Sequence, residues 1–149
     1  MREFPTVAEK TAFVKPYADK YGLDLATVCA VIEQESGWYW AAVRYEPAFF
    51  ARYIEGMRGL TDCEKSFRAT SFGLMQIMGQ VAREHGFSGS SLLELADPDA
   101  NLEYGCKKLA ECFRLSPDPE KALLHYNGGG NLEYGREVLA RIAKYQGAA

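Results

Sequence analysis

The stretch VCAVIEQESGW, residues 28–38, is an apolar helical segment that ends in a carboxylate and a glycine. Asp24 precedes the segment as a helix N-cap, and apolar side chains recur at helical spacing over residues 25–32. Gly37 then stops the helix. The pattern predicts a helix with one face in a hydrophobic core and a glutamate in its last turn.

The two glutamates of this segment, Glu33 and Glu35, are expected to lie in opposite environments. Glu35 continues the apolar face near Ile32 and Val28, whereas Glu33 is turned about 200° away from it and should face water. Burial and the negative end of the helix dipole both disfavour the charged form of Glu35, so its pKa should be raised, as a general acid requires. A glutamate at a frayed helix end, with its head in water, fits the same position.

Length and composition predict a single domain, residues 1–149. The chain is 48% apolar by a broad count, and no linker or low-complexity tract divides it. Its net charge of −3, with both signs interspersed, gives no reason to expect nucleic acid or an anionic membrane as a partner. No apolar run approaches the length of a membrane span, and the N-terminus lacks the apolar segment of a signal peptide.

The four cysteines indicate a reduced protein without a metal site. Their spacing is not that of a zinc site, so we expect no metal and no cofactor. Cys29 and Cys106 fall at core-compatible positions and are expected to be buried thiols. Cys106 and Cys112 lie on one predicted helix and point about 120° apart, which argues against a local disulfide.

The remainder of the chain reads as a succession of helices, and no segment has the period of a strand. Helix starts are indicated by capping boxes at Thr6–Glu9, Thr61–Glu64 and Ser91–Glu94, and by prolines at Pro47, Pro98 and Pro119. Pro16 is expected to kink or divide the first helix, the aromatic residues after Gly37 are expected to be mostly core, and the last helix is expected to use Leu132, Leu139, Ile142 and Tyr145. The predicted fold is mostly α.

One short sequence occurs twice. Asn101-Leu102-Glu103-Tyr104-Gly105 recurs as residues 131–135. Two copies do not make a repeat protein, and we interpret them as similar helix starts under similar packing demands.

Four short blocks occur in a fixed order, each at a predicted helix end or start: QESG at 34–37, GLMQ at 73–76, NLxxG at 101–105 and YNGG at 126–129. In this order they resemble the lytic transglycosylases of the soluble (SLT) type over nearly the whole chain. The resemblance implies a mostly α, lysozyme-like domain of packed helices around a substrate cleft. It also implies cleavage of the β-1,4 bond between N-acetylmuramic acid and N-acetylglucosamine in peptidoglycan, with formation of 1,6-anhydromuramic ends.

The resemblance also assigns roles to individual residues. Glu35 matches the single catalytic acid/base, and Ser36 matches the neighbour that positions the scissile sugar. Gly73, Leu74, Met75 and Gln76 match the cleft wall, where glycine permits close approach and Gln76 both donates and accepts hydrogen bonds. Tyr126 matches the tyrosine whose hydroxyl reaches the catalytic carboxylate, and Asn127 accompanies it. From the residues alone, Met75 and Met78 fit core filling equally well, and Asn101 fits a simple helix start.

The long stretch between Glu35 and Gln76 keeps other functions open. It contains Glu46 and Asp62, either of which could serve as the second carboxylate of a hydrolytic muramidase of goose-lysozyme or phage-endolysin character. A non-catalytic wall-binding or assembly module is the remaining alternative. All three place the chain at the cell wall, in the periplasm or outside the cell. With no signal peptide, that location predicts a phage-encoded, specially exported or trimmed chain. Separately, a monomer is expected.

Overall fold

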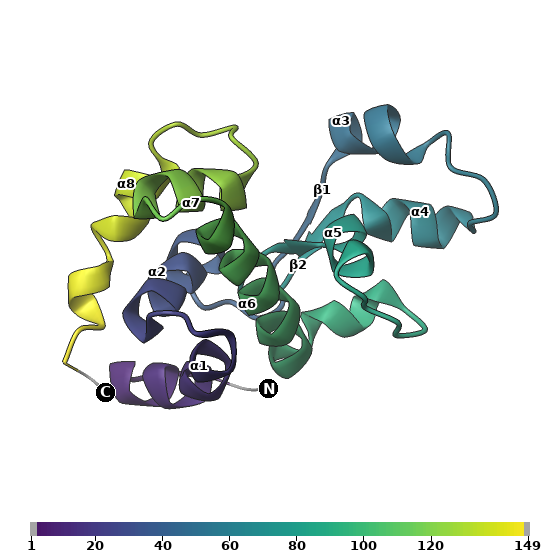
Figure 1. Ribbon diagram of the computed structural model, residues 1–149. Coiled ribbons are helices and arrows are strands. Elements are labelled where there is room, and N and C mark those ends of the chain that lie inside the picture. Colours follow the sequence, from purple (N-terminus) through teal and green to yellow (C-terminus); the bar gives the residue numbers. More distant parts are fainter. Residues whose placement is uncertain (1–2, 148–149) are drawn as a thin grey trace.

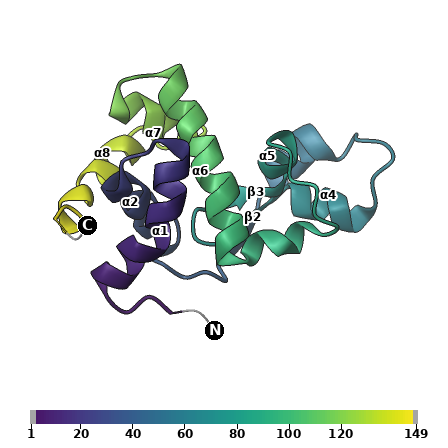
Figure 2. The ribbon, with the colours of Figure 1, turned by 60° about the horizontal axis from the view of Figure 1, so that its bottom comes forward.

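The structure is a computed structural model that describes residues 3–147 as two lobes, which meet at the long helix α6 of the first lobe (Figure 1). In the view turned by 60°, α6 again lies where the two lobes meet (Figure 2). The elements of the first lobe are α1 (Val7–Tyr21), α2 (Leu25–Ser36), α6 (Pro98–Leu115), α7 (Pro119–Asn127), α8 (Tyr134–Leu139) and the 3-10 helix η3 (Ile142–Lys144). Those of the second lobe are β1 (Val43–Tyr45), α3 (Pro47–Phe49), the π-helix η1 (Phe50–Ile54), α4 (Asp62–Arg68), β2 (Thr70–Phe72), β3 (Ile77–Met78), α5 (Gly79–Glu84) and the 3-10 helix η2 (Leu92–Ala96).

The core of the first lobe forms around α2. Residues 26–32 are all buried, because α1, α8 and η3 pack against this helix. The apolar face predicted from the sequence is confirmed, and burial extends around the whole circumference of the helix. The predicted ends are confirmed too. Asp24 Oδ2 accepts a hydrogen bond from the Thr27 backbone N–H at 2.8 Å, and Gly37 ends the helix with a left-handed φ of 59°.

Most other predicted helix boundaries are also confirmed. The capping boxes at Thr6 and Ser91 both form, and the prolines at 47, 98 and 119 each stand at the start of a helix. The division of the first helix at Pro16 is wrong, since α1 runs unbroken from Val7 to Tyr21. Packing of Val14 and Ala18 in the core outweighs the one backbone hydrogen bond that a proline removes.

A small antiparallel sheet, in the order β1-β2-β3, was not predicted from the sequence. Its strands are only two or three residues long, too short for a period of two to stand out. Phe72 pairs with Ile77, so the turn at residues 73–76 joins β2 to β3. The side chains of both residues enter a second hydrophobic core with Leu92 and Leu95. The mostly α fold class is nevertheless confirmed.

Two predictions about the core are wrong. In the segment that follows Gly37, Tyr39, Tyr45 and Tyr53 are 60%, 48% and 52% exposed, so these aromatic residues are not core. The segment continues into β1, α3 and η1, which lie at one side of the second lobe (Figure 1). Leu132 is 76% exposed because the last helix begins after it, at Tyr134.

Asn101 joins the two lobes from a fully buried position at the start of α6. Its Oδ1 accepts a hydrogen bond from the Met75 backbone N–H at 2.8 Å. Its Nδ2 donates to the backbone oxygens of Phe72 at 2.7 Å and Leu95 at 2.8 Å. The interpretation of Asn101 as a simple helix-start residue is therefore wrong, because its amide satisfies three buried backbone groups.

Two glycines make room for this junction. Gly73 has a φ of 72°, and a Cβ on it would lie 2.4 Å from Asn101 Nδ2. A Cβ on Gly105 would lie 2.5 Å from the sulfur of Met75. Both distances are shorter than atoms tolerate, so a side chain at either position would push the turn away from α6. The NLxxG block thus supplies both the amide and the space that hold the GLMQ turn.

Replacing Asn101 by alanine should lower the free energy of unfolding by about 3 kcal/mol or more, since three buried backbone groups lose their partner at about 1–3 kcal/mol each. Asn131, at the matching position of the second NLEYG copy, is exposed and provides the control. Asn131→Ala should cost about 1 kcal/mol or less. Urea unfolding of both variants measures the difference, and equal losses would show that the Asn101 amide is not a structural junction.

Candidate active site

Glu35 lies in the last turn of α2, half-buried, with its carboxylate held by Tyr134. The Tyr134 hydroxyl donates a hydrogen bond of 2.5 Å to Glu35 Oε1. Tyr134 is the first residue of α8 and is itself buried. Burial also raises the pKa of Tyr134, so its hydroxyl keeps its proton and acts as a donor to the carboxylate.

The surroundings of Glu35 raise its pKa above the ordinary value of a glutamate. The main cause is burial, which removes the water that would stabilise the charged form. The Tyr134 hydrogen bond and the positive charges of Lys108 and Arg44 act in the opposite direction without cancelling it. The carboxyl group therefore holds its proton more firmly than an exposed glutamate does, as the sequence predicts.

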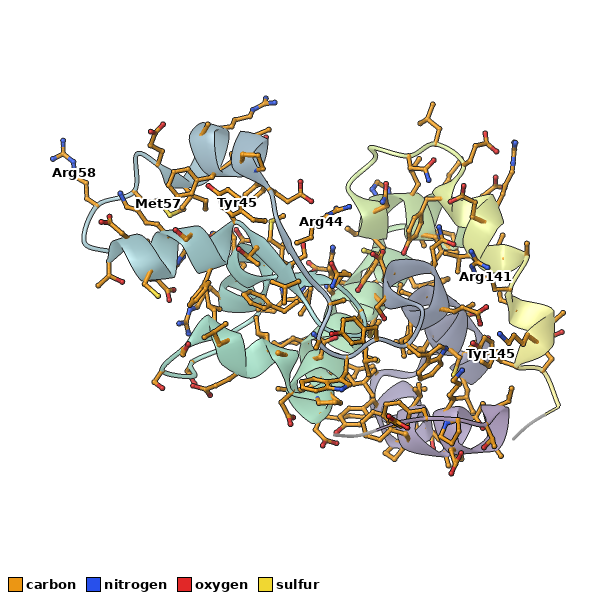
Figure 3. All side chains as sticks on the ribbon, turned by 180° about the vertical axis from the view of Figure 1, so that it is seen from behind. Arg44, Tyr45, Met57, Arg58, Arg141 and Tyr145 are labelled. Atoms are coloured by element: carbon orange, nitrogen blue, oxygen red, sulfur yellow. The ribbon has the colours of Figure 1, made fainter. Side chains whose placement is uncertain are left out.

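Glu33 has the opposite shift, but it does not face open water. Its side chain is 20% exposed and lies 3.0 Å from Lys144 Nζ and 3.9 Å from Arg141 Nη1. The Tyr145 hydroxyl also donates to it. Burial alone would raise the pKa of Glu33, but these partners outweigh it and the pKa is lowered. The expectation that Glu33 faces water is wrong because the C-terminal segment, where Figure 3 labels Arg141 and Tyr145, packs over it.

A cavity of about 450 Å³ opens beside Glu35 between the two lobes. Its polar and charged lining includes Glu35, Arg44, Glu46, Gln76, Lys108 and Asn127. Aromatic rings of Phe49, Tyr53 and Tyr126 also line it. In Figure 3, Arg44 extends from β1 into the space between the lobes. The cavity therefore combines a protonatable acid with polar, charged and aromatic residues.

A larger concavity, of about 690 Å³, lies between α5 and α6. Its carboxylates belong to Glu84 and Glu111, and neither is enclosed as Glu35 is, since Glu84 is exposed and the Glu111 side chain is 43% exposed. The Glu35 cavity is thus the better candidate for acid chemistry.

Gln76 reaches the cavity from a strained backbone position with a φ of 47°. Its Nε2 donates to the backbone oxygens of Gly73 at 3.0 Å and Ala42 at 3.1 Å. Both amide protons are thereby used, and none of the described hydrogen bonds uses Oε1. Gln76 is therefore fixed as an acceptor toward the cavity, not as the donor and acceptor expected from the sequence.

The other residues of the GLMQ block do not form the cavity wall. Gly73, Leu74 and Met75 are buried, and none of them lines the cavity. The expectation that Gly73 permits close approach of a sugar is replaced by its contact with Asn101. Met75 fills the core, whereas Met78 lines the cavity.

Ser36 also lies outside the cavity lining. Its Oγ is 2.8 Å from the Leu74 carbonyl oxygen and 3.2 Å from the Ile32 carbonyl oxygen. The hydroxyl therefore ties the end of α2 to the turn at residues 73–76.

The tyrosine that contacts Glu35 is not the one that the family resemblance suggests. The Tyr126 hydroxyl donates to the Met75 carbonyl oxygen at 2.7 Å, so it does not reach the Glu35 carboxylate. The residue that does is Tyr134, which the sequence analysis did not select. Tyr134 belongs to the second copy of the NLEYG sequence. Its place in that copy is the only sequence signal that could have drawn attention to it. Asn127 lines the cavity as expected, and its Oδ1 accepts from the Asn131 backbone N–H at 2.9 Å.

Glu46 shares the cavity with Glu35. It immediately precedes α3 but makes no side-chain cap hydrogen bond. Its carboxylate instead lies 2.5 Å from Arg44 Nε, and its side chain is 30% exposed. A second carboxylate is thus present in the cavity, already paired with a cation. Asp62, the other candidate base, stands at the start of α4 and does not line the cavity.

Within residues 3–147, no group of three or more histidine, cysteine, aspartate or glutamate side chains is arranged to hold a metal ion. All four cysteines are free thiols, of which Cys63 is exposed. None of the described helices has the length and apolar character needed to cross a membrane.

A comparison with protein-family models finds one described as the Transglycosylase SLT domain, which matches residues 13–140. The match begins within α1 and ends just after α8. It therefore includes Glu35, the turn at residues 73–76, Asn101, Tyr126 and Tyr134.

Proposed function

Because the chain belongs to the SLT transglycosylase family, we propose that it is a peptidoglycan lytic transglycosylase with Glu35 as its single acid/base. The substrate bond is the β-1,4 link between N-acetylmuramic acid and N-acetylglucosamine, and the product carries a 1,6-anhydromuramic end. The observation that supports this most is the half-buried Glu35, with a raised pKa and a tyrosine donor, on the wall of the cavity.

In the first half-reaction Glu35 acts as an acid. Its proton moves to the glycosidic oxygen as the bond from that oxygen to the muramic anomeric carbon breaks, and the N-acetylglucosamine leaves as an alcohol. The acetamido group of the muramic residue stabilises the positive charge on the anomeric carbon. Glu35 becomes a carboxylate, and the hydrogen bond from Tyr134 strengthens as that charge develops.

In the second half-reaction the same carboxylate acts as a base. It takes the proton of the muramic C6 hydroxyl while that oxygen bonds to the anomeric carbon and closes the 1,6-anhydro ring. Glu35 returns to its protonated form, and no water is consumed. A tethered hydroxyl can have an effective concentration of about 10⁵ M, so water competes only where the protein provides a dedicated base.

Two polar residues of the cavity suit the substrate. Gln76 Oε1 is available to accept a hydrogen bond from an acetamido N–H or a sugar hydroxyl, because its amide protons are used by Gly73 and Ala42. Asn127 lines the same cavity at the end of α7. Together with the family match, these residues support a peptidoglycan glycan strand as the partner and the cell wall as the place of action.

A hydrolytic muramidase is the second candidate, and Glu46 is the observation that favours it. Glu46 lines the cavity that Glu35 lines, and an inverting hydrolase places its base about 6.5–9.5 Å from the acid to leave room for water. The ion pair with Arg44 argues against this role, because the guanidinium already occupies the carboxylate oxygen that would have to bind the attacking water.

Tyr134→Phe should lower the turnover rate by tens-fold to about a thousandfold, the range expected when one positioned donor is removed from a charged centre. Tyr126→Phe is the matched control, since it removes a hydroxyl that binds the Met75 carbonyl oxygen instead. Its loss should stay below about tenfold. Turnover of purified peptidoglycan measures both. A larger effect from Tyr126→Phe would return to Tyr126 the role that its sequence block suggests.

Mass spectrometry of the products in water with labelled oxygen tests the proposed function. We expect 1,6-anhydromuramic ends, lighter by one water than hydrolysis products and free of label, from both the wild type and Glu46→Gln. Glu35→Gln should yield no product, because an amide neither donates nor accepts the proton as required.

Labelled reducing-end muramic acid from the wild type, lost in Glu46→Gln, would establish the hydrolase instead. Absence of any product from the folded wild type would leave the wall-binding or assembly module as the remaining function.

A further inference from the structure

Lys108 places a positive charge in the same cavity as Glu35. It lies on α6, half-buried, with its Nζ 2.7 Å from the Tyr126 carbonyl oxygen. The ammonium also lies 4.3 Å from the centre of the Tyr126 ring. Its neighbour Lys107 is exposed and does not line this cavity.

The contact with the Tyr126 carbonyl oxygen explains only part of the position of Lys108. Tyr126 is in the last turn of α7, where carbonyl oxygens lack helical partners and a cation is favourable. An ammonium has three protons to donate, and the described hydrogen bonds of Lys108 use one of them. No ion pair within 4 Å is described for Lys108, in contrast to Glu46, which is paired with Arg44 in the same cavity. A half-buried, unpaired cation is costly, so its position beside a catalytic acid calls for a functional reason.

The charges of Lys108 and Glu35 affect each other. Burial lowers the pKa of Lys108, while Glu35 acts to raise it. Lys108 in turn lowers the pKa of Glu35 against the larger effect of burial. Each group therefore favours the charged form of the other, as two opposite charges do in a medium of low dielectric.

We propose that Lys108 is a positioning residue of the reaction, whose ammonium stabilises the Glu35 carboxylate and so adjusts Glu35 to serve as acid and base in turn. This inference rests on the proposed function. Burial alone would make the carboxyl a poor proton donor and its carboxylate an unstable intermediate. A fixed positive charge across the cavity offsets both effects without supplying a competing proton acceptor, since a charged lysine has no lone pair.

Several other titratable or charged groups face this pair. The groups that face Glu35 are Tyr134 on α8, Arg44 on β1 and Glu46, which immediately precedes α3. The electrostatic partners of Lys108 include the Cys112 thiol and His85. Tyr134 is neutral, and its pKa is far above the working range. Arg44 is 74% exposed and paired with Glu46, so water and its partner screen it. Lys108 is the less exposed of the two cations and therefore the stronger influence.

The test compares Lys108→Met, which removes the charge and the donor, with Lys108→Gln, which keeps a donor without the charge. The first half-reaction needs protonated Glu35, so the rate falls as pH rises through the pKa of Glu35. Loss of the positive charge raises that pKa, and the falling limb should move to higher pH by about half to one unit in both variants. Lys108→Arg, which keeps the charge, should stay close to the wild type.

Lys107→Met is the matched control, because it removes the same charge from the same helix at an exposed position outside the cavity. Its pH–rate profile should not move. A second readout is the carbon-13 NMR titration of the Glu35 carboxyl group, which needs no substrate and should show the same upward shift in Lys108→Met and Lys108→Gln. If either of these variants does not fold, the other supplies both readouts.

The outcomes separate the two claims. An unshifted Glu35 titration in folded Lys108→Gln overturns the role of Lys108 and leaves it as a cap of α7, whatever the product. A shifted titration without 1,6-anhydromuramic product overturns the proposed function and leaves the electrostatic coupling standing. A shift equal to that of Lys107→Met overturns the specific role, because it reports only the net charge of the chain.

Discussion

The backbone turn at residues 73–76 is the structural constraint on which the candidate active site depends. The turn is buried, so its peptide groups need partners within the protein. Three helices supply them with side chains: Ser36 from α2 to the Leu74 carbonyl oxygen, Asn101 from α6 to the Met75 N–H, and Tyr126 from α7 to the Met75 carbonyl oxygen. Each of the four short sequence blocks therefore contributes to one hydrogen-bonded junction between the lobes.

This junction places the chemical groups around the cavity. Fixing the turn presents Gln76 from one lobe, and the helices that hold the turn carry Glu35 and Lys108 from the other. The core around α2 then removes water from Glu35, which raises its pKa, while Tyr134 and Lys108 limit the rise. The packing around α2 therefore both stabilises the fold and sets the acid strength of Glu35. Ser36, Asn101 and Tyr126, one from each of three blocks, help to build the site by holding the turn.

Sequence reasoning predicted the helices well because their ends carry local signals, such as Asp24 and Gly37 on α2. It missed the three short strands, whose pairing is set by contacts distant in sequence. It selected Glu35 from one helical face and predicted its raised pKa, and it named Glu46 as a possible second carboxylate, which the structure places in the cavity lining. It assigned the contact with the carboxylate to Tyr126 and overlooked Tyr134, because which hydroxyl reaches a carboxylate depends on how α7 and α8 pack.

The central claim is that this packing gives two neighbouring glutamates of one helix opposite acid strengths. Carbon-13 NMR titration of the carboxyl groups of Glu33 and Glu35 in the unliganded wild type measures it most directly. The pKa of Glu35 should lie above the ordinary value of about 4.3, and that of Glu33 below it. Titration of both groups at the ordinary value, or of Glu33 above Glu35, would contradict the account.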